Sequence, residues 1–320
     1  MAAVDSFPFL YREISRSCSS YFETLALVGA LYAARKAVIL LNDCCTLVRV
    51  HFLPRMIPSR KLTQRYGDWA VIYGASEPVA SAYAEELTRH GINIIFITQD
   101  DTVIRDAAAS LSQTYGVETL VVLTDFSLGR AASKPIKDAL RGKDIGFLVN
   151  CVQDTTAFPR SLIDTPEHDL LDQVNKNIVV ATLVTRLVLP GMVERCRGAV
   201  VNISSGACCR PLRGRVALTA FTGYLDHFSR ALHLEYRDKG IFVQSLIPFQ
   251  IASGRLQPSS SPKDGWFVPR PEVYARHAIS TLGVSNRTTG YWPHTLQYGL
   301  MRCIPEWIWI LGSRMLISAS

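Results

Sequence analysis

The chain has 320 residues, enough for one large domain or two small ones, and with 48% hydrophobic and 19% charged residues it is typical of a globular protein. Its net charge of +7 is spread along the sequence without a run of five or six like charges, which excludes a nucleic-acid-binding arm. A basic excess of this size suits an anionic membrane surface or a phosphorylated ligand, although solubility alone would also explain it.

The N-terminal segment, residues 1–66, is unusually hydrophobic. Residues 22–34 form an apolar stretch of 13 residues that Arg35 and Lys36 end, and a second apolar stretch follows. Neither reaches the roughly 18 to 20 apolar residues that span a bilayer. The acidic Asp5 and Glu13 argue against a signal peptide. We expect a targeting or membrane-associated segment built as an interfacial helical pair, with Arg35 and Lys36 at the headgroups. Helices packed on the protein's own core are the alternative.

From residue 68 onward, short aliphatic segments alternate with amphipathic ones. We expect strands at residues 69–73, 92–98, 118–123, 145–150, 199–203 and 241–247. A helix is expected at 79–90, and two long helices at about 166–194 and 216–238. Strands that are apolar throughout belong to a parallel sheet covered on both faces. The sequence therefore predicts an α/β fold with a Rossmann-type doubly wound parallel sheet over residues 67–290.

The C-terminal extension, residues 291–320, is again hydrophobic. It places Trp307 and Trp309 beside Ile308 and Ile310. Paired tryptophans next to aliphatic residues favour a membrane interface or a hydrophobic partner groove. A dimer contact or a lid over a substrate pocket would give the same pattern.

Eight cysteines and seven histidines lack the spacings of a metal site or a disulfide framework. No cysteines form a C-x-x-C pair, although Cys44 and Cys45, and likewise Cys208 and Cys209, are adjacent. No H-E-x-x-H or similar histidine spacing occurs. We predict reduced thiols in an intracellular compartment and no metal ion.

Polar residues and a glycine follow the predicted strands in a recognisable order. They are Gly74 after the first strand, Asp125 after the third, Asn150 at the end of the fourth, Asn177 on a helix and Ser205 after the fifth. With the PFQIAS segment at 248–253, this order resembles the short-chain dehydrogenase/reductase family over about residues 67–290. The resemblance implies hydride transfer between a carbonyl and a nicotinamide cofactor.

A narrower resemblance extends into the N-terminal segment. The opening segment MAAVDSF and the later segments AYAEEL, LPGMVER and YLDHFSRAL are similar to the hydroxysteroid dehydrogenase branch, and within it to a member regarded as inactive and associated with mitochondria. This resemblance implies a mitochondrial location. The N-terminal residues alone allow the endoplasmic reticulum membrane equally.

The catalytic pair of the family is absent from its expected positions. The family uses a Tyr about thirteen residues after the serine as proton donor, and a Lys four residues later lowers the Tyr pKa. Counting from Ser205 reaches Leu218 and then Thr222, neither of which supplies a proton or a positive charge. General acid catalysis typically contributes about 10² to 10⁴-fold, so we predict no ordinary reductase activity, with only Ser205 and Asn177 retained. Leu218 fits packing at helical spacing, and an unrecognised catalytic arrangement is the alternative.

The cofactor loop departs from the family in the same direction. The resemblance assigns it to Gly74, Ala75, Ser76, Glu77, Pro78, Val79 and Ala80. Pro78 and Ala80 replace glycines of the pattern, Pro78 has no N–H to donate, and Glu77 would repel a phosphate. For folding alone, Ser76 as a cap and Pro78 as the first helical residue would be favourable. We expect weakened NADP binding, with Asp125 and Asn150 as vestigial contacts.

Three functions remain open on these observations. The leading hypothesis is a catalytically inactive homologue that serves as a binding or interaction protein at mitochondria, with an unidentified protein partner. The alternative is a membrane-associated NADP-dependent steroid or 3-ketoacyl reductase that uses a non-standard acid. A lipid carrier is the third. The resemblance also implies a homodimer through the two long middle helices.

Overall fold

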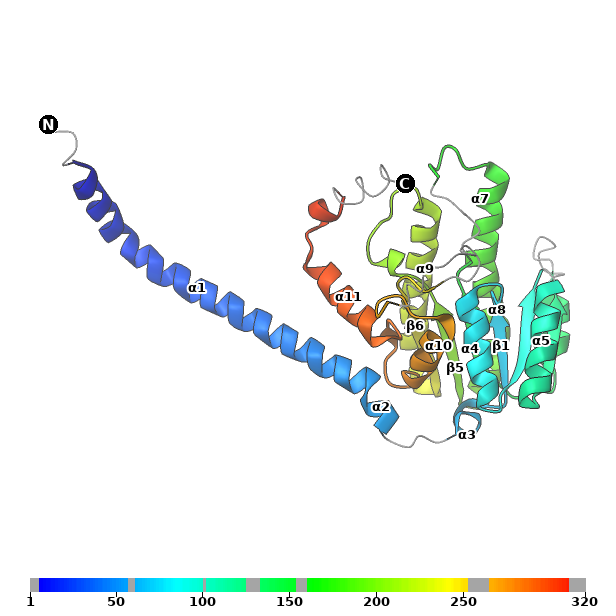
Figure 1. Cartoon of the computed structure of the whole chain (residues 1–320). Helices are drawn as coiled ribbons and strands as arrows, with labels where there is room; N and C mark the ends of the chain where they lie inside the picture. The colour runs from blue at the N-terminus through cyan, green and yellow to red at the C-terminus, as the bar shows by residue number, and fades with distance from the viewer. Residues whose placement is uncertain are drawn as a thin grey trace. The chain divides into compact units, whose positions relative to one another are not determined.

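The computed structural model of the chain describes residues 6–56, 61–99, 102–124, 133–153, 160–252 and 265–310 (Figure 1). It divides into two compact units, Met1–Arg49 and Val50–Ser320. The boundary therefore lies before residues 50–66, which the sequence analysis had placed in the N-terminal segment. Asp125, one of the predicted cofactor contacts, lies outside the described residues.

The first unit is formed by one continuous helix, α1 (Ser6–His51), whose last residues reach into the second unit. The expected pair of helices is wrong, because Arg35 and Lys36 are good helix formers and interrupt the apolar run without ending the helix. The segment Thr24–Met56 has 33 residues, and an 18-residue stretch of it has a mean hydropathy of 1.7 and no buried residue, so it is long and apolar enough to cross a membrane. The prediction that no stretch reaches that length is wrong as well.

Exposed apolar side chains cover α1. Leu25, Leu31 and Leu40 are 73%, 64% and 65% exposed. Glu167–Glu194 is also long and apolar enough, but 44% of its most apolar 18 residues are buried, as in a helix that packs on a core.

The second unit is built on a seven-stranded parallel sheet in the order β3-β2-β1-β4-β5-β6-β7. The strands are β1 (Trp69–Tyr73), β2 (Asn93–Thr98), β3 (Thr119–Leu123), β4 (Ile145–Cys151), β5 (Gly198–Ile203), β6 (Ile241–Leu246) and β7 (Arg287–Thr288). The predicted fold class and its six strands are confirmed to within one residue at each end. The seventh strand was missed because two residues are too short for a hydrophobic pattern.

Helices cover both faces of this sheet (Figure 1). They are α2 (Leu53–Met56), α3 (Leu62–Tyr66), α4 (Pro78–Arg89), α5 (Thr102–Tyr115), α6 (Ser133–Leu140), α7 (Glu167–Val174), α8 (Val180–Glu194), α9 (Val216–Tyr236), α10 (Pro271–Ser280) and α11 (Trp292–Cys303). Along β1, Ala70 and Ile72 join the core under α4, α5 and α10, whereas Val71 and Tyr73 join the core under α6, α8 and α9. This alternation follows from the opposite directions of successive side chains on a strand.

The strand order reverses between β1 and β4, and this position is where doubly wound sheets bind ligands at their carboxyl ends. Gly74 ends β1 with a φ of 84°, and a Cβ atom there would lie 2.8 Å from the Cys151 carbonyl oxygen. Only glycine therefore allows β1 and β4 to approach this closely at the edge that carries the candidate site.

Candidate functional site

Ser205 follows β5 and caps a short 3₁₀ turn, Gly206–Cys208. Its backbone is extended and its Oγ accepts a hydrogen bond of 3.4 Å from the Ala207 N–H. The preceding Ser204 is buried and donates from Oγ to the Thr222 carbonyl oxygen at 3.0 Å. The end of β5 is therefore tied to α9, and Ser205 is half-buried beside it.

Asn177 lies in a π-helical turn, Asn175–Val179, that joins α7 to α8 and interrupts the long helix expected at 166–194. Its side chain is buried, and Oδ1 accepts from the Gln153 N–H at 2.7 Å. Its Nδ2 donates to the Gln153 and Gln173 carbonyl oxygens, both at 3.1 Å. Asn177 thus holds the chain after β4 against the helix, and both its amide atoms are engaged in doing so.

Leu218 and Thr222, the positions of the missing catalytic pair, are both used for packing on α9. Leu218 is half-buried and packs against the buried cluster of Val152, Ala181 and Leu225. Thr222 is fully buried, and its Oγ1 donates to the Leu218 and Thr219 carbonyl oxygens at 2.9 and 3.0 Å. Neither side chain has a proton to deliver, since Leu218 is apolar and the Thr222 hydroxyl is turned onto its own helix.

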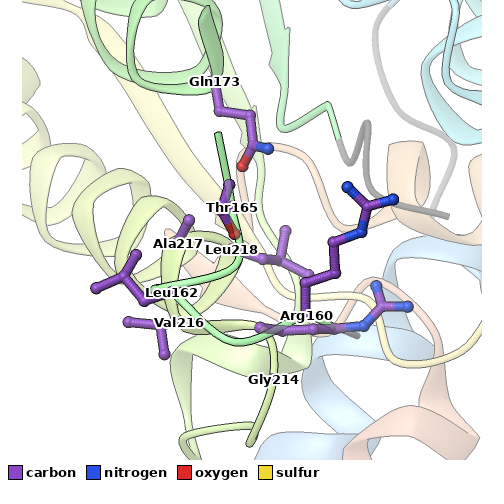
Figure 2. A pocket seen from close by; sticks show the side chains of 9 residues that line it. Arg160, Leu162, Thr165, Gln173, Gly214, Val216, Ala217 and Leu218 are labelled. Atoms are coloured by element: carbon purple, nitrogen blue, oxygen red, sulfur yellow. The ribbon is translucent and has the colours of Figure 1, made fainter. Parts of the chain in front are cut away.

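A small cavity lies beside Leu218, with a free volume of about 20 Å³, which is room for about one water. Figure 2 shows the Gln173 amide from α7, Leu218 from α9 and the Arg160 side chain arranged around it. Its lining therefore combines apolar, amide and cationic groups, but it is too small for a steroid or an acyl chain.

The nearby tyrosines do not replace the missing acid. The Tyr224 hydroxyl lies 2.6 Å from Thr182 Oγ1 on α8, and its ring stacks on Phe228 with 5.5 Å between centroids. Tyr236 packs its ring under Lys239 with Nζ 4.7 Å from the centroid. A hydrogen bond to Glu235 raises the pKa of Tyr236, which makes its proton harder to release.

The loop before α4 does not fit a pyrophosphate. Glu77, rather than the expected Ser76, is the N-cap residue of α4, and Pro78 begins the helix as predicted. The Glu77 N–H donates to the Gly74 carbonyl oxygen at 3.0 Å and is used within the loop. Pro78 has no N–H, so the helix start offers only the amides of Val79 and Ala80, beside the negative charge of Glu77. Burial, followed by that charge, raises the pKa of Cys151 well above its usual value.

Asn150 is placed inside the core. Its Nδ2 donates to Thr185 Oγ1 at 3.1 Å and to Asn202 Oδ1 at 2.9 Å, and Asn202 donates in turn to Ser229 at 2.8 Å. The side chain therefore joins β4 and β5 to α8 and α9, a role that the position of Asn150 at a strand end did not indicate. In the loop between β1 and α4, Ala75 is buried and Ser76 is half-buried.

Cysteine and histidine side chains form no metal centre in the described part of the chain, since no group of three His, Cys, Asp or Glu residues there could hold an ion. The seven cysteines with described side chains are free thiols, and Cys208 and Cys209 lie in contact. Their adjacency was visible in the sequence, but the contact depends on the 3₁₀ turn.

Comparisons with known proteins agree with this fold. The family model described as short chain dehydrogenase matches residues 68–264. The chain is 55% identical over 320 residues, 100% of both chains, to a Danio rerio protein named inactive hydroxysteroid dehydrogenase-like protein 1. It is 36% identical over 246 residues to the Homo sapiens very-long-chain 3-oxoacyl-CoA reductase, which covers 76% of this chain and 78% of the reductase.

Among solved structures, one from work on 7β-hydroxysteroid dehydrogenase stereoselectivity superposes with a TM-score of 0.70. It is 23% identical and covers 79% of this chain and 99% of its own, so it supports the fold alone. The Danio rerio relative also matches residues 1–67, which lie before the part that the family model recognises.

Proposed function

The chain belongs to the short-chain dehydrogenase/reductase family, and we propose that it is a catalytically inactive member that acts as a binding or interaction protein at mitochondria. The observation that carries the loss of activity is the packing of Leu218 and Thr222 where the family's acid and its cationic partner belong. The full-length relative named inactive supports the same conclusion.

The chemistry explains why these two positions decide the activity. Reduction of a ketone needs a proton at the carbonyl oxygen as hydride arrives at carbon, and NADPH, when bound, would supply only the hydride. Ser205 can orient an oxygen through its hydroxyl, and Asn177 is occupied by Gln153 and Gln173. Thr222 has no positive charge that could lower the pKa of a neighbouring hydroxyl toward neutral pH. The retained residues can therefore bind a ligand without reducing it.

Cofactor affinity is reduced along with the chemistry. The loop at Glu77 and Pro78 withholds N–H donors from a pyrophosphate and adds a negative charge. Each lost charge-assisted hydrogen bond costs about 1.5 to 3 kcal/mol, so NADP binding at millimolar affinity or weaker is expected.

Membrane attachment through α1 is part of the proposal. The exposed apolar segment Thr24–Met56 supports it, and Arg35 and Lys36 suit anionic headgroups. The family resemblance favours a mitochondrial membrane, and the endoplasmic reticulum membrane is the alternative. A fluorescent fusion of the full chain, imaged with markers of both organelles, distinguishes these locations.

A homodimer through α8 and α9 is the oligomer that the surface supports. A groove of about 600 Å³ lies between these helices, lined by apolar side chains that include Leu189, Pro190, Phe228 and Leu232. Sedimentation of the purified chain at several concentrations tests this pairing. An unidentified protein partner would compete for the same groove.

Turnover measurement tests the loss of activity directly. Purified full-length protein is incubated with steroid ketones or 3-ketoacyl-CoA and with NADPH or NADH, and we expect no consumption above background. Clear turnover that Ser205→Ala abolishes would contradict the proposal. The double variant Leu218→Tyr, Thr222→Lys tests whether restoring the acid-base pair restores turnover. New turnover would mean that only this pair was missing.

A reductase with a non-standard acid is the second candidate, favoured by the 36% identity to a 3-oxoacyl-CoA reductase over 76% of the chain. Such an enzyme must bind its cofactor. Calorimetric titration with NADPH therefore separates the two functions, because absence of binding at millimolar NADPH removes this candidate.

A further inference from the structure

The thiols of Cys208 and Cys209 lie in contact on the turn that follows Ser205. Their Sγ atoms are 3.5 Å apart, and both residues are half-buried. Cys208 ends the 3₁₀ turn Gly206–Cys208 and Cys209 is its C-cap residue, with a backbone hydrogen bond of 3.1 Å from Cys209 N–H to the Gly206 carbonyl oxygen. The turn, and not mere adjacency in sequence, brings the two sulfur atoms together.

The surroundings make the two thiols unequal. The hydrogen bond between the two thiols, with the nearby Arg287 guanidinium, lowers the pKa of Cys209. The same hydrogen bond, with burial, raises the pKa of Cys208. Arg287 is itself held in place by Asp226, with Nε 3.0 Å from Oδ1. The positive charge of Arg287 favours the thiolate form of Cys209, which is the form that reacts with a peroxide, so we assign the attack to Cys209.

Cys44 and Cys45 provide an internal contrast. They are also adjacent, but they lie on α1, where consecutive side chains point about 100° apart and do not face each other. Both are exposed. The chain thus carries two pairs of consecutive cysteines. Among the residues that the structure describes, only Cys208 and Cys209 have their sulfur atoms in contact.

We propose that Cys208 and Cys209 form a two-thiol modification site that a hydroperoxide oxidises to a disulfide between adjacent residues. The Cys209 thiolate attacks the peroxide, the O–O bond breaks, and Cys209 becomes a sulfenic acid while the departing oxygen leaves as an alcohol or as water. Cys208 sulfur then attacks Cys209 sulfur, the S–O bond breaks, and hydroxide leaves with the Cys208 proton as water. Two thiols lose two electrons and two protons, and the peroxide gains them.

The disulfide, once formed, is expected to be reduced readily. Adjacent Cα atoms lie about 3.8 Å apart across a trans peptide, closer than the 4.4 to 6.8 Å usual for disulfides, so the bridge requires the turn to rearrange. The next residues hold the C-terminal part of the chain. Arg210 donates to the Met301 and Ile304 carbonyl oxygens, and the Trp309 indole N–H donates to the Pro211 carbonyl oxygen at 3.1 Å. These contacts begin one residue after Cys209, so a rearranged turn acts on them directly.

Peptide mass analysis of the full chain tests the site with its own control. Reduced protein is exposed to hydrogen peroxide, quenched with N-ethylmaleimide and digested with trypsin, which gives peptides 198–213 and 37–49 with one adjacent pair each. We expect peptide 198–213 to lose two hydrogens, carry no maleimide and recover both thiols with dithiothreitol. Peptide 37–49 should carry two maleimides after peroxide treatment, the same number that it carries in the untreated sample.

Two serine variants assign the roles. Cys208→Ser should leave a sulfenic acid at Cys209 that dimedone captures, and Cys209→Ser should slow the reaction with peroxide about tenfold or more, as expected for a thiol without a lowered pKa. Two maleimides on peptide 198–213 after peroxide would overturn the proposal. So would oxidation of peptide 37–49 at the same rate, or oxidation of Cys209 to sulfinic acid without the disulfide.

Discussion

Thr222 occupies the position of the family's lysine and is fully buried. A lysine side chain at this position would have to extend out of the core to reach a ligand. The Thr222 hydroxyl bonds within α9, and Ser204 donates to its carbonyl oxygen, so the surroundings are shaped around a short side chain. Leu218 is likewise fitted to the cluster of Val152, Ala181 and Leu225. At the scale of single residues, the loss of acid-base chemistry is accompanied by tight apolar packing.

Thr222→Lys should therefore destabilise the protein strongly. The substitution should lower the free energy of unfolding by about 2 to 5 kcal/mol. A buried lysine without a partner or a route to solvent must either keep its charge in the core or lose it through a pKa that falls by several units. Thr222→Val, which keeps the shape and loses two hydrogen bonds within the helix, should cost about 1 kcal/mol. Urea denaturation followed by circular dichroism gives both values. A lysine variant as stable as the valine variant would reveal a path from Thr222 to a ligand cavity.

Leu218→Ala should cost about 1 to 3 kcal/mol of unfolding free energy, less than a fully buried leucine because Leu218 is only half-buried. Val216→Ala is the matched control, since Val216 lines the same small cavity but is 52% exposed. It should change stability by no more than about 0.5 kcal/mol. Equal losses from both variants would mean that Leu218 does not anchor α9 to the cluster.

At the scale of elements, the sequence predicts regular structure well where one local pattern decides it. The apolar runs of β1 and β5 each give one strand, and Pro78 gives the start of α4. The π-helical turn at Asn177 could not be predicted, because it depends on hydrogen bonds to Gln153 across the site. The order of Ser205, Leu218 and Thr222 located the candidate site, whereas the core network of Asn150 depends on tertiary contacts with Thr185 and Asn202.

His294 on α11 should make stability fall in mild acid. It is fully buried, its Nδ1 accepts from the Phe249 N–H and its Nε2 lies 3.2 Å from the Phe267 carbonyl oxygen, so the neutral ring serves both contacts. Burial lowers its pKa from 6.5 to about 4. Because the unfolded chain binds the proton first, stability is complete above about pH 6.5 and decreases as the pH falls to 4, by at most about 3 kcal/mol.

Denaturation midpoints measured between pH 7 and pH 4 check this dependence. His294→Asn keeps an acceptor near Nδ1 without a titrating ring, so its stability should decline less over the same interval, even if it starts lower. His168→Asn is the matched control, since His168 is exposed on α7. A slope that His294→Asn does not reduce would assign the acid sensitivity to other groups.

At the scale of the whole molecule, the two units carry separate tasks. Both hydrophobic cores, all seven strands and the candidate site belong to Val50–Ser320, whereas α1 exposes apolar side chains along its length. Val50 and His51 are buried, and the distance from His51 Nε2 to Thr295 Oγ1 is 2.9 Å, so the second unit includes the end of the helix. Removal of residues 1–49 should therefore leave the sheet domain folded while abolishing membrane attachment.

Flotation with vesicles of zwitterionic and anionic phospholipid tests this division. The full chain should float with the vesicles, and a chain that begins at Val50 should remain at the bottom of the gradient with a thermal unfolding midpoint close to that of the full chain. Leu27→Glu with Leu31→Glu is the matched variant, because both side chains are exposed on one face of α1 and each charge costs roughly 2.5 to 3.5 kcal/mol in the bilayer centre. It should reduce flotation without shortening the protein. Flotation that persists without residues 1–49 would instead assign membrane binding to the second unit, where the exposed Leu300 and Trp307 are the apolar side chains to substitute next.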